Sequence, residues 1–425
     1  MFYRLFLMLS VLLATMVLYA ADVTDVVDAA DDDDPFDFTL DISYNSSHHF
    51  GTIKREYNNY EDNAYEDVNG NRYYTVDQRR VQTNEYKGNP LLQYTQILDI
   101  NAEIGLYHDL SLSVDIPIVL SDRYSLLFDN YYFNGAGNAT AYPGSLPASG
   151  LFPADGALSY KHKGVGDLTI GMNWAPFSQE RGVWPFSWLV AFHVTFPTSA
   201  KATPSGMNDR DSNGNMNPTG MTGKVGTKNY TLHFITAMSK RVEMFEPYFR
   251  LHFDLPIAGS NSLYQNMRKE YGFDFGTEFV FWERPKKEQE IRMRLDFNLL
   301  FSTRGNSYNY ITDARWVYPA GTGTFLDGSP RDLKHILPME DAWAQAGIML
   351  KFDFHVWKYL EFGTHIQFNY RSNRYLTDAK VGEAGYINGL DSEKTNWLSD
   401  TKSGGRLFME NNMILNWGVN LALLF

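Results

Sequence analysis

The chain has 425 residues, a formal net charge of −13 and a pI near 5.2. This acidic balance argues against nucleic acid or an anionic membrane surface as the main partner. The sequence contains no cysteine, which excludes disulfides, thiolate nucleophiles and cysteine-based metal sites. Aromatic residues make up 15% of the chain, a content that favours β structure with interfacial aromatic side chains.

The N-terminal residues have the pattern of an export signal. Arg4 precedes an apolar run over residues 5–19, and Ala20 and Ala21 offer small residues for cleavage. We therefore predict that residues 1–20 are a cleaved signal peptide, the alternative being an anchored helix. Residues 21–35, which include four consecutive aspartates at 31–34, are expected to form a solvated acidic tail.

Residues 36–425 alternate between apolar and polar residues, the period of a β-strand. The alternating segments come in pairs that are joined by short turns, and long polar loops separate the pairs. We expect about twelve strands, an even number that brings both ends to one side. The segments cover residues 36–44, 94–106, 110–120, 168–174, 188–196, 230–234, 249–255, 271–281, 291–301, 348–354, 360–370 and 413–425.

Short and long connections alternate strictly along this list. The long loops are expected at residues 46–90, 123–163, 198–228, 257–270, 303–340 and 371–406. A secreted all-β protein, which is the alternative, has no reason to place every long loop at one end. A barrel through an outer membrane does, because short turns face the periplasm and long loops face outside. The predicted fold is one antiparallel transmembrane β-barrel of all-β class over residues 36–425.

The last segment is apolar on one face and ends on Phe425. An open edge cannot remain in hydrocarbon, so this strand is expected to pair with the first one and close the barrel. The segment resembles the C-terminal signature of bacterial outer-membrane β-barrels, which implies recognition by the barrel-assembly machinery. The residues that carry this resemblance are Leu415, Trp417, Val419, Leu421, Leu423 and Phe425.

Aromatic residues near the predicted strand ends suggest interfacial girdles. The candidates are Tyr94, Tyr107, Trp174, Trp188, Tyr248, Trp282, Trp343, Trp357, Tyr359 and Tyr370. Ordinary aromatic packing in β structure is the alternative explanation.

Charged residues of both signs occupy the strand positions that face the lumen of a barrel. Turn positions place Glu278 opposite Arg292 or Arg294 and Lys351 opposite Glu361. Across the outer loop, Arg250 is a second candidate partner for Glu278. Two interpretations remain open: a field across a pore that orients solutes, or charge pairs that fill a narrow lumen. The candidate lumen residues are Asp99, Glu103, Asp115, Arg250, Glu278, Arg292, Arg294, Asp296, Lys351 and Glu361.

One segment has half of a calcium-binding pattern. Asp209, Asp211 and Asn213 match the opening of a calcium loop, but Gly220 stands where a bidentate glutamate belongs. A polar surface loop is the alternative. The sequence has no P-loop, HExxH or GxSxG motif, so we predict no enzyme activity and no cofactor beyond this calcium candidate.

The stretch from residue 164 to 174 opens with Gly164, Gly166 and Asp167. It resembles a strand opening in outer-membrane proteins that are assigned to the meta-pathway of phenol degradation, a group thought to handle aromatic uptake. The resemblance covers one strand and implies a transporter-like barrel. Gly164, Gly166 and Asp167 are the positions that match the family's motif.

The sequence thus predicts an outer-membrane channel or transporter for small molecules, such as aromatic or other small hydrophobic or anionic solutes. The alternative is a non-conducting structural or adhesive barrel that acts through its long outer loops. The expected location is the outer membrane of a Gram-negative bacterium. The expected partners are outer-membrane lipid and lipopolysaccharide, the assembly machinery and a small solute, and the expected state is a monomer.

Overall fold

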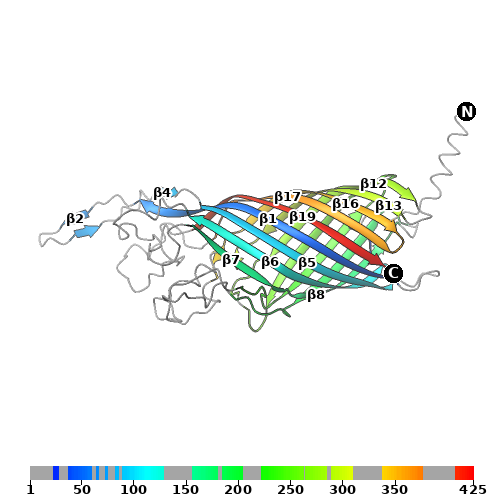
Figure 1. The fold of residues 1–425 in the computed structure, drawn as a ribbon, viewed down its shortest axis with the longest axis horizontal. Coiled ribbons are helices and arrows are strands. Elements are labelled where there is room, and N and C mark those ends of the chain that lie inside the picture. Colours follow the sequence, from blue (N-terminus) through cyan, green and yellow to red (C-terminus); the bar gives the residue numbers. More distant parts are fainter. Residues whose placement is uncertain are drawn as a thin grey trace, which may run out of the picture.

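The computed structural model describes most of the chain. The described residues are 23–27, 37–59, 64–66, 72–74, 82–85, 89–128, 156–179, 184–203, 222–262, 264–284, 289–309, 337–376 and 407–425. They form a closed, tilted antiparallel β-barrel (Figure 1). None of the described residues belongs to a helix that is long and apolar enough to cross a membrane.

The wall of the barrel contains the predicted strands. They are β1 (Phe38–Asn59), β5 (Asn89–Tyr107), β6 (Leu110–Phe128), β8 (Leu168–Phe177), β9 (Ser187–Phe196), β10 (Asn229–Ser239), β11 (Phe245–Ala258), β12 (Glu270–Arg284), β13 (Gln289–Ser302), β16 (Trp343–Trp357), β17 (Leu360–Arg371) and β19 (Leu407–Leu424). Each pairs with its neighbours in chain order, and β19 pairs with β1 to close the sheet. The predicted twelve-stranded fold is confirmed.

The outward face of the wall is apolar because every second side chain points away from the lumen. Aromatic rings there form rows across neighbouring strands. Phe192, Phe234, Phe253 and Tyr271 lie on four successive strands, with ring centroids 5.0, 6.3 and 4.9 Å apart. Phe234 and Tyr271 are 45% and 44% exposed, which suits a surface that hydrocarbon covers.

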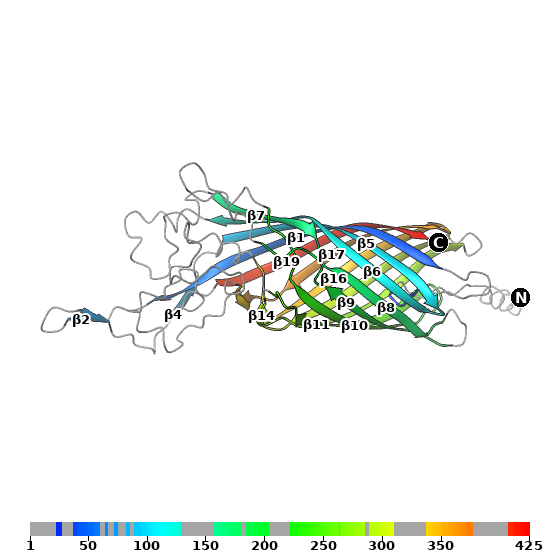
Figure 2. The same ribbon diagram turned by 90° about the horizontal axis from the view of Figure 1, so that it is seen from below.

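The two ends of the barrel differ. At one end, called the turn end, the short connections and Phe425 lie together. At the other, called the loop end, the long connections begin (Figures 1 and 2). The loop end also carries short strands: β2 (Ala64–Glu66), β3 (Arg72–Tyr74), β4 (Gln82–Glu85), β7 (Gly156–Val165), β14 (Gly305–Asn306), β15 (Met339–Glu340) and β18 (Arg374–Tyr375).

The predicted loop boundaries were too wide on one side of the barrel. Residues 46–59 of the expected first loop continue β1, and β7 within the expected loop 123–163 pairs with the outer half of β6. The cause is polar composition: once a strand leaves hydrocarbon, both of its faces can be polar, so apolar alternation no longer marks it.

Two of the predicted girdle residues face the lumen instead. Tyr248 is 5% exposed and Trp343 is 9% exposed. The alternation of side chains along a strand explains both positions. Phe249 on β11 and Ile348 on β16 point outward. Tyr248 and Trp343 are an odd number of residues away from them and therefore point inward. In contrast, Trp357 is 61% exposed at the turn end, as an interfacial residue should be.

Candidate functional site

Ion pairs occupy the lumen near β11, β12, β13 and β16. Arg250 Nη2 lies 2.7 Å from Asp274 Oδ2, and Arg294 Nη1 lies 3.8 Å from Glu278 Oε1. The carboxylates Asp274 and Glu278 are only 4% and 2% exposed. Two more pairs join Arg292 to Glu290 (2.7 Å) and Lys351 to Asp353 (3.1 Å). Asp296, another candidate, is also buried.

The register corrects two of the predicted cross-strand pairs. Glu278 does lie opposite Arg294, but Arg250 lies opposite Asp274 rather than Glu278. Lys351 lies opposite His365, and Glu361 instead faces His355, with Nδ1 and Oε2 4.0 Å apart. The turn from β16 to β17 lies further along the chain than expected and contains a bulge between His355 and Trp357. Shifting a turn centre by two residues moves each partner by four.

Reversing the charge of Arg294 tests whether these pairs stabilise the barrel. In Arg294→Glu, the new carboxylate faces the buried Glu278, so we expect a loss of about 3–5 kcal/mol and a lower temperature at which the barrel unfolds in SDS. Gel mobility after stepwise heating measures this. The control is Arg304→Glu, because Arg304 is in a half-exposed ion pair with Asp341 and should change little. Unaltered heat resistance together with altered ion selectivity would favour the pore-field interpretation.

The predicted acidic residues lie across the barrel from these arginines. In the closed strand order, β5 and β6 are six places from β12 and β13. Asp99 accepts a hydrogen bond from Asn45 Nδ2 (2.8 Å), and Glu103 accepts from Ser111 and from Asn173 Nδ2 (2.9 Å). Asp115 lies opposite Asn101 in the register. Charged side chains therefore occupy both sides of the lumen, as either interpretation requires.

Residues 23–27 lie inside the barrel at its turn end, not in a solvated tail. Thr24 Oγ1 is 2.7 Å from Ser239 Oγ. Val23 and Val26 are buried in one apolar cluster whose other members are Ala175, Leu189, Ala237 and Tyr248. The alanines leave room where larger side chains would fill the lumen. The aspartates at 31–34, like the predicted signal peptide, are outside the described residues.

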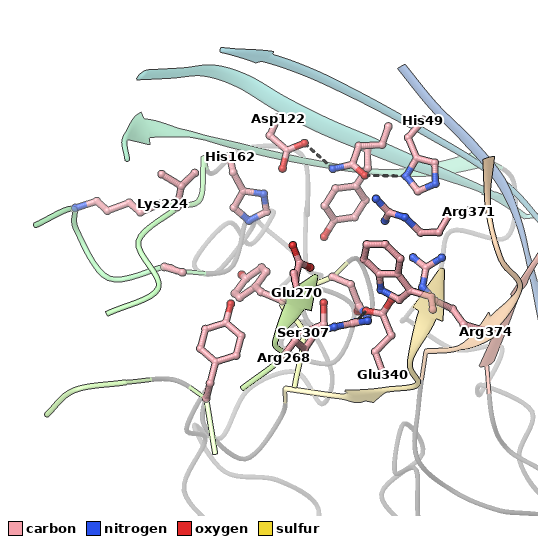
Figure 3. Close-up of a pocket in the computed structure, with 18 residues that line it drawn as sticks. His49, Asp122, His162, Lys224, Arg268, Glu270, Ser307, Glu340, Arg371 and Arg374 are labelled. Carbon is pink, nitrogen blue, oxygen red and sulfur yellow. Dashed lines mark hydrogen bonds and ion pairs between the residues drawn. The ribbon is translucent and has the colours of Figure 1, made fainter. Parts of the chain in front are cut away.

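A cavity of about 390 Å³ lies inside the loop end. Its wall combines residues of β1, β5, β6, β7, β12 and β16 with residues of the long connections (Figure 3). Polar and aromatic side chains predominate. The lining includes His49, Gln93, Asp122, Tyr124, His162, Lys224, Tyr264, Arg268, Glu270, Tyr308, Glu340, Trp343, Arg371 and Arg374.

Three guanidinium groups surround the indole of Trp343 at one side of this cavity. The Cζ atoms of Arg371, Arg268 and Arg374 lie 4.0, 5.3 and 5.8 Å from the ring centroid. Glu340 pairs with Arg374 and, at 3.0 Å, with Arg268. Burial raises the pKa of Glu340, but the two neighbouring guanidinium groups outweigh burial and lower it below its usual value. We call Arg268, Glu340, Trp343, Arg371 and Arg374 the cationic cluster.

Sequence reasoning missed the cationic cluster. Its members lie in the connections or at the loop-end tips of β15, β16, β17 and β18. Four of these positions fall in the expected polar loops, and Trp343 was expected in an interfacial girdle. No sequence motif relates residues 268, 340 and 374, which follow three different strands of the wall. These residues come together only when the barrel forms.

The glycine–aspartate stretch at the end of β7 anchors a connection. Gly164 has a φ of 151°, and Gly166 N donates to Pro117 O (2.7 Å), where a Cβ would lie 2.8 Å from the proline ring. Asp167 accepts hydrogen bonds from Ser199 N (2.9 Å) and Ser199 Oγ, and from Thr227 Oγ1 (3.3 Å). One carboxylate thus holds both arms of the connection between β9 and β10, which lines the cavity.

Removing this carboxylate should loosen that connection. In Asp167→Ala, three acceptor contacts are lost, at a cost of about 1–3 kcal/mol, so we expect faster trypsin cleavage after Lys201 and Lys224. Mass spectrometry of the refolded protein measures the rates. Asp167→Asn keeps one acceptor oxygen and is the matched control. Equal cleavage rates in the alanine variant and the unmodified chain would contradict the anchoring role.

Asp209, Asp211 and Asn213 lie outside the described residues. Within the described part of the chain, no group of three or more histidine, aspartate or glutamate residues is placed to hold a metal ion.

Comparison with known proteins gives similarity in fold. No protein-family model matches the chain, and neither does any curated protein. An outer-membrane channel from Pseudomonas putida F1 aligns at 12% identity over 96% of this chain and 100% of that chain (TM-score 0.42). A Pseudomonas aeruginosa FadL homologue aligns at 11% identity over 92% of this chain and 90% of that chain, with a TM-score of 0.34. The Ralstonia pickettii toluene transporter TbuX aligns at 9% identity over 92% of this chain and 88% of that chain, with a TM-score of 0.31.

The class of protein follows from the strands themselves. The closed strand order, the apolar outward face and the charged inward face define a β-barrel of the outer-membrane type.

Proposed function

We propose that this protein is a channel or transporter for small molecules in the outer membrane of a Gram-negative bacterium. One observation carries the proposal: a polar, solute-sized cavity of about 390 Å³ lies inside the loop end of a closed barrel. Cavities of roughly this size and larger accommodate small organic ligands. In this membrane the loop end would face outside, so the cavity would be the first binding position for an entering solute.

The further partners follow from the same placement. Outer-membrane lipid would cover the aromatic rows, lipopolysaccharide would surround the loop end, and the assembly machinery would bind β19. We propose a monomer by analogy, because trimeric porins usually have more strands than this barrel. Calcium at residues 209–213 stays a weaker proposal that depends on sequence alone.

A second function is favoured by a different observation. Ion pairs fill part of the lumen, and residues 23–27 occupy its turn end. A barrel filled in this way could be a non-conducting scaffold that presents its long loops to partners outside.

Single-channel recording of the refolded mature chain in a planar bilayer separates these functions. Stable ohmic steps would support the channel. Silent bilayers, with the barrel shown to be folded by its heat-modifiable gel mobility, would overturn a permanently open channel and favour the scaffold.

A further inference from the structure

The cationic cluster contains a buried donor that lacks a partner among the described residues. Arg374 is 5% exposed, and its Nη1 atom has no hydrogen-bond partner within the described part of the chain. Its Nε atom donates to Glu340. A buried donor on a charged group is costly when unsatisfied, so an acceptor that enters the cavity would bind here with a gain in free energy.

The charge around the cavity favours an anion. The lining contains four cationic side chains, Lys224, Arg268, Arg371 and Arg374, against three carboxylates, Asp122, Glu270 and Glu340. With the histidines neutral, one positive charge remains. Nearer to Trp343, three guanidinium groups lie around the indole ring, and Glu340 pairs with two of them, Arg268 and Arg374 (Figure 3).

Arg371 is oriented by a neutral group. Its Nε and Nη2 atoms donate to Gln345 Oε1 at 3.1 and 2.9 Å. This amide oxygen fixes the plane of the guanidinium. A planar guanidinium presents paired donors that match the two oxygens of a carboxylate.

Part of the remaining wall offers aromatic and apolar surface. Tyr124, Tyr264, Tyr308 and Val225 also line the cavity, and the ring of Tyr308 packs edge-on against His162 at 5.6 Å. Burial raises the pKa of Tyr264 to about 12, so its phenol is neutral at physiological pH and does not repel an anion.

We propose that the loop-end cavity binds a small organic monocarboxylate, whose carboxylate accepts hydrogen bonds from Arg374 and Arg371 and whose apolar body lies along the tyrosines. This inference deepens the proposed transport function by naming the class of solute. It assigns the cationic cluster as the selectivity-determining part of the entrance.

Isothermal titration calorimetry on the refolded full chain in detergent tests the proposal with sodium benzoate as the probe. Benzyl alcohol has the same ring without the charge, and inorganic phosphate has the charge without the ring. We expect benzoate to bind about tenfold more tightly than either, a difference of about 1.4 kcal/mol. Equal binding of benzoate and benzyl alcohol would overturn the carboxylate site, and tighter binding of phosphate would point to an inorganic anion instead.

Two variants locate the site. Arg374→Gln should weaken benzoate binding about tenfold and leave benzyl alcohol unchanged, whereas the rim variant Arg304→Gln should bind benzoate normally. If Arg374→Gln loses its heat-modifiable mobility, the half-buried Arg371→Gln replaces it with the same expectation. A folded variant that retains full benzoate affinity would refute the assignment.

Failure of this inference differs from failure of the proposed function. If benzoate binds but no channel current is recorded, the carboxylate site stands and the proposal of conduction is refuted. Ohmic steps without benzoate binding would leave the channel intact and refute the carboxylate site.

Discussion

A chain that lacks residues 22–27 is expected to conduct several-fold more current than the unmodified chain. Val23, Thr24 and Val26 lie within the lumen at the turn end, packed against Ala175 and Ala237. Deleting the segment removes these side chains without altering the strands that form the wall. Single-channel conductance in a planar bilayer measures the effect.

The control for this deletion keeps the segment and changes the neighbouring charge. A variant in which the aspartates at positions 31–34 are replaced by asparagine retains Val23 and Val26, and should conduct like the unmodified chain after correction for ion selectivity. If the deletion conducts no more than this control, residues 22–27 do not restrict the lumen.

Removal of Phe425 is expected to abolish most of the assembled barrel in cells. Phe425 N donates to Phe38 O and Phe38 N donates to Phe425 O, both at 2.9 Å, and the two rings lie 6.0 Å apart. These are the last contacts of the seam between β1 and β19, and an unpaired backbone group at a membrane boundary is costly. The measurement is the amount of heat-modifiable protein in isolated outer membranes.

A conservative variant separates the seam from aromatic recognition. Phe425→Leu keeps both backbone hydrogen bonds but loses the ring contact. We expect an intermediate amount of assembled barrel if recognition of the aromatic residue contributes. Normal surface levels after complete removal of Phe425 would contradict the closing role of this residue.

The sequence was sufficient to predict the barrel wall, but not the contacts between side chains inside the lumen. Alternation along each segment predicted the strands, their order and the closing pair of β1 with β19, because hydrocarbon imposes apolar residues on one face only. Trp417, Leu421 and Leu423 lie in this closing strand, and each lies in register with a residue of β1. Their recognition by assembly machinery stays a prediction.

Features of the lumen depend on information that alternation does not contain. The partner of Lys351 follows from a turn that lies further along the chain than expected, which apolar alternation does not reveal. The burial of Val23 follows from small residues on β8 and β10 that are distant in sequence. The cationic cluster depends on three connections that meet only after closure. The sequence therefore indicates which residues face inward, and only the three-dimensional structure shows which of them meet.

The height of the wall varies around the barrel. β1 has 22 residues and β9 has 10, and at about 3.3 Å per residue the difference is about 40 Å along the strand. A tilted strand of about 9–11 residues crosses the roughly 30 Å of a hydrocarbon core. β9 would just span such a core, and the side built from β1, β5, β6 and β19 would continue well beyond it. An antibody or phage that approaches an intact cell would therefore meet this taller side of the wall before it could reach the cavity.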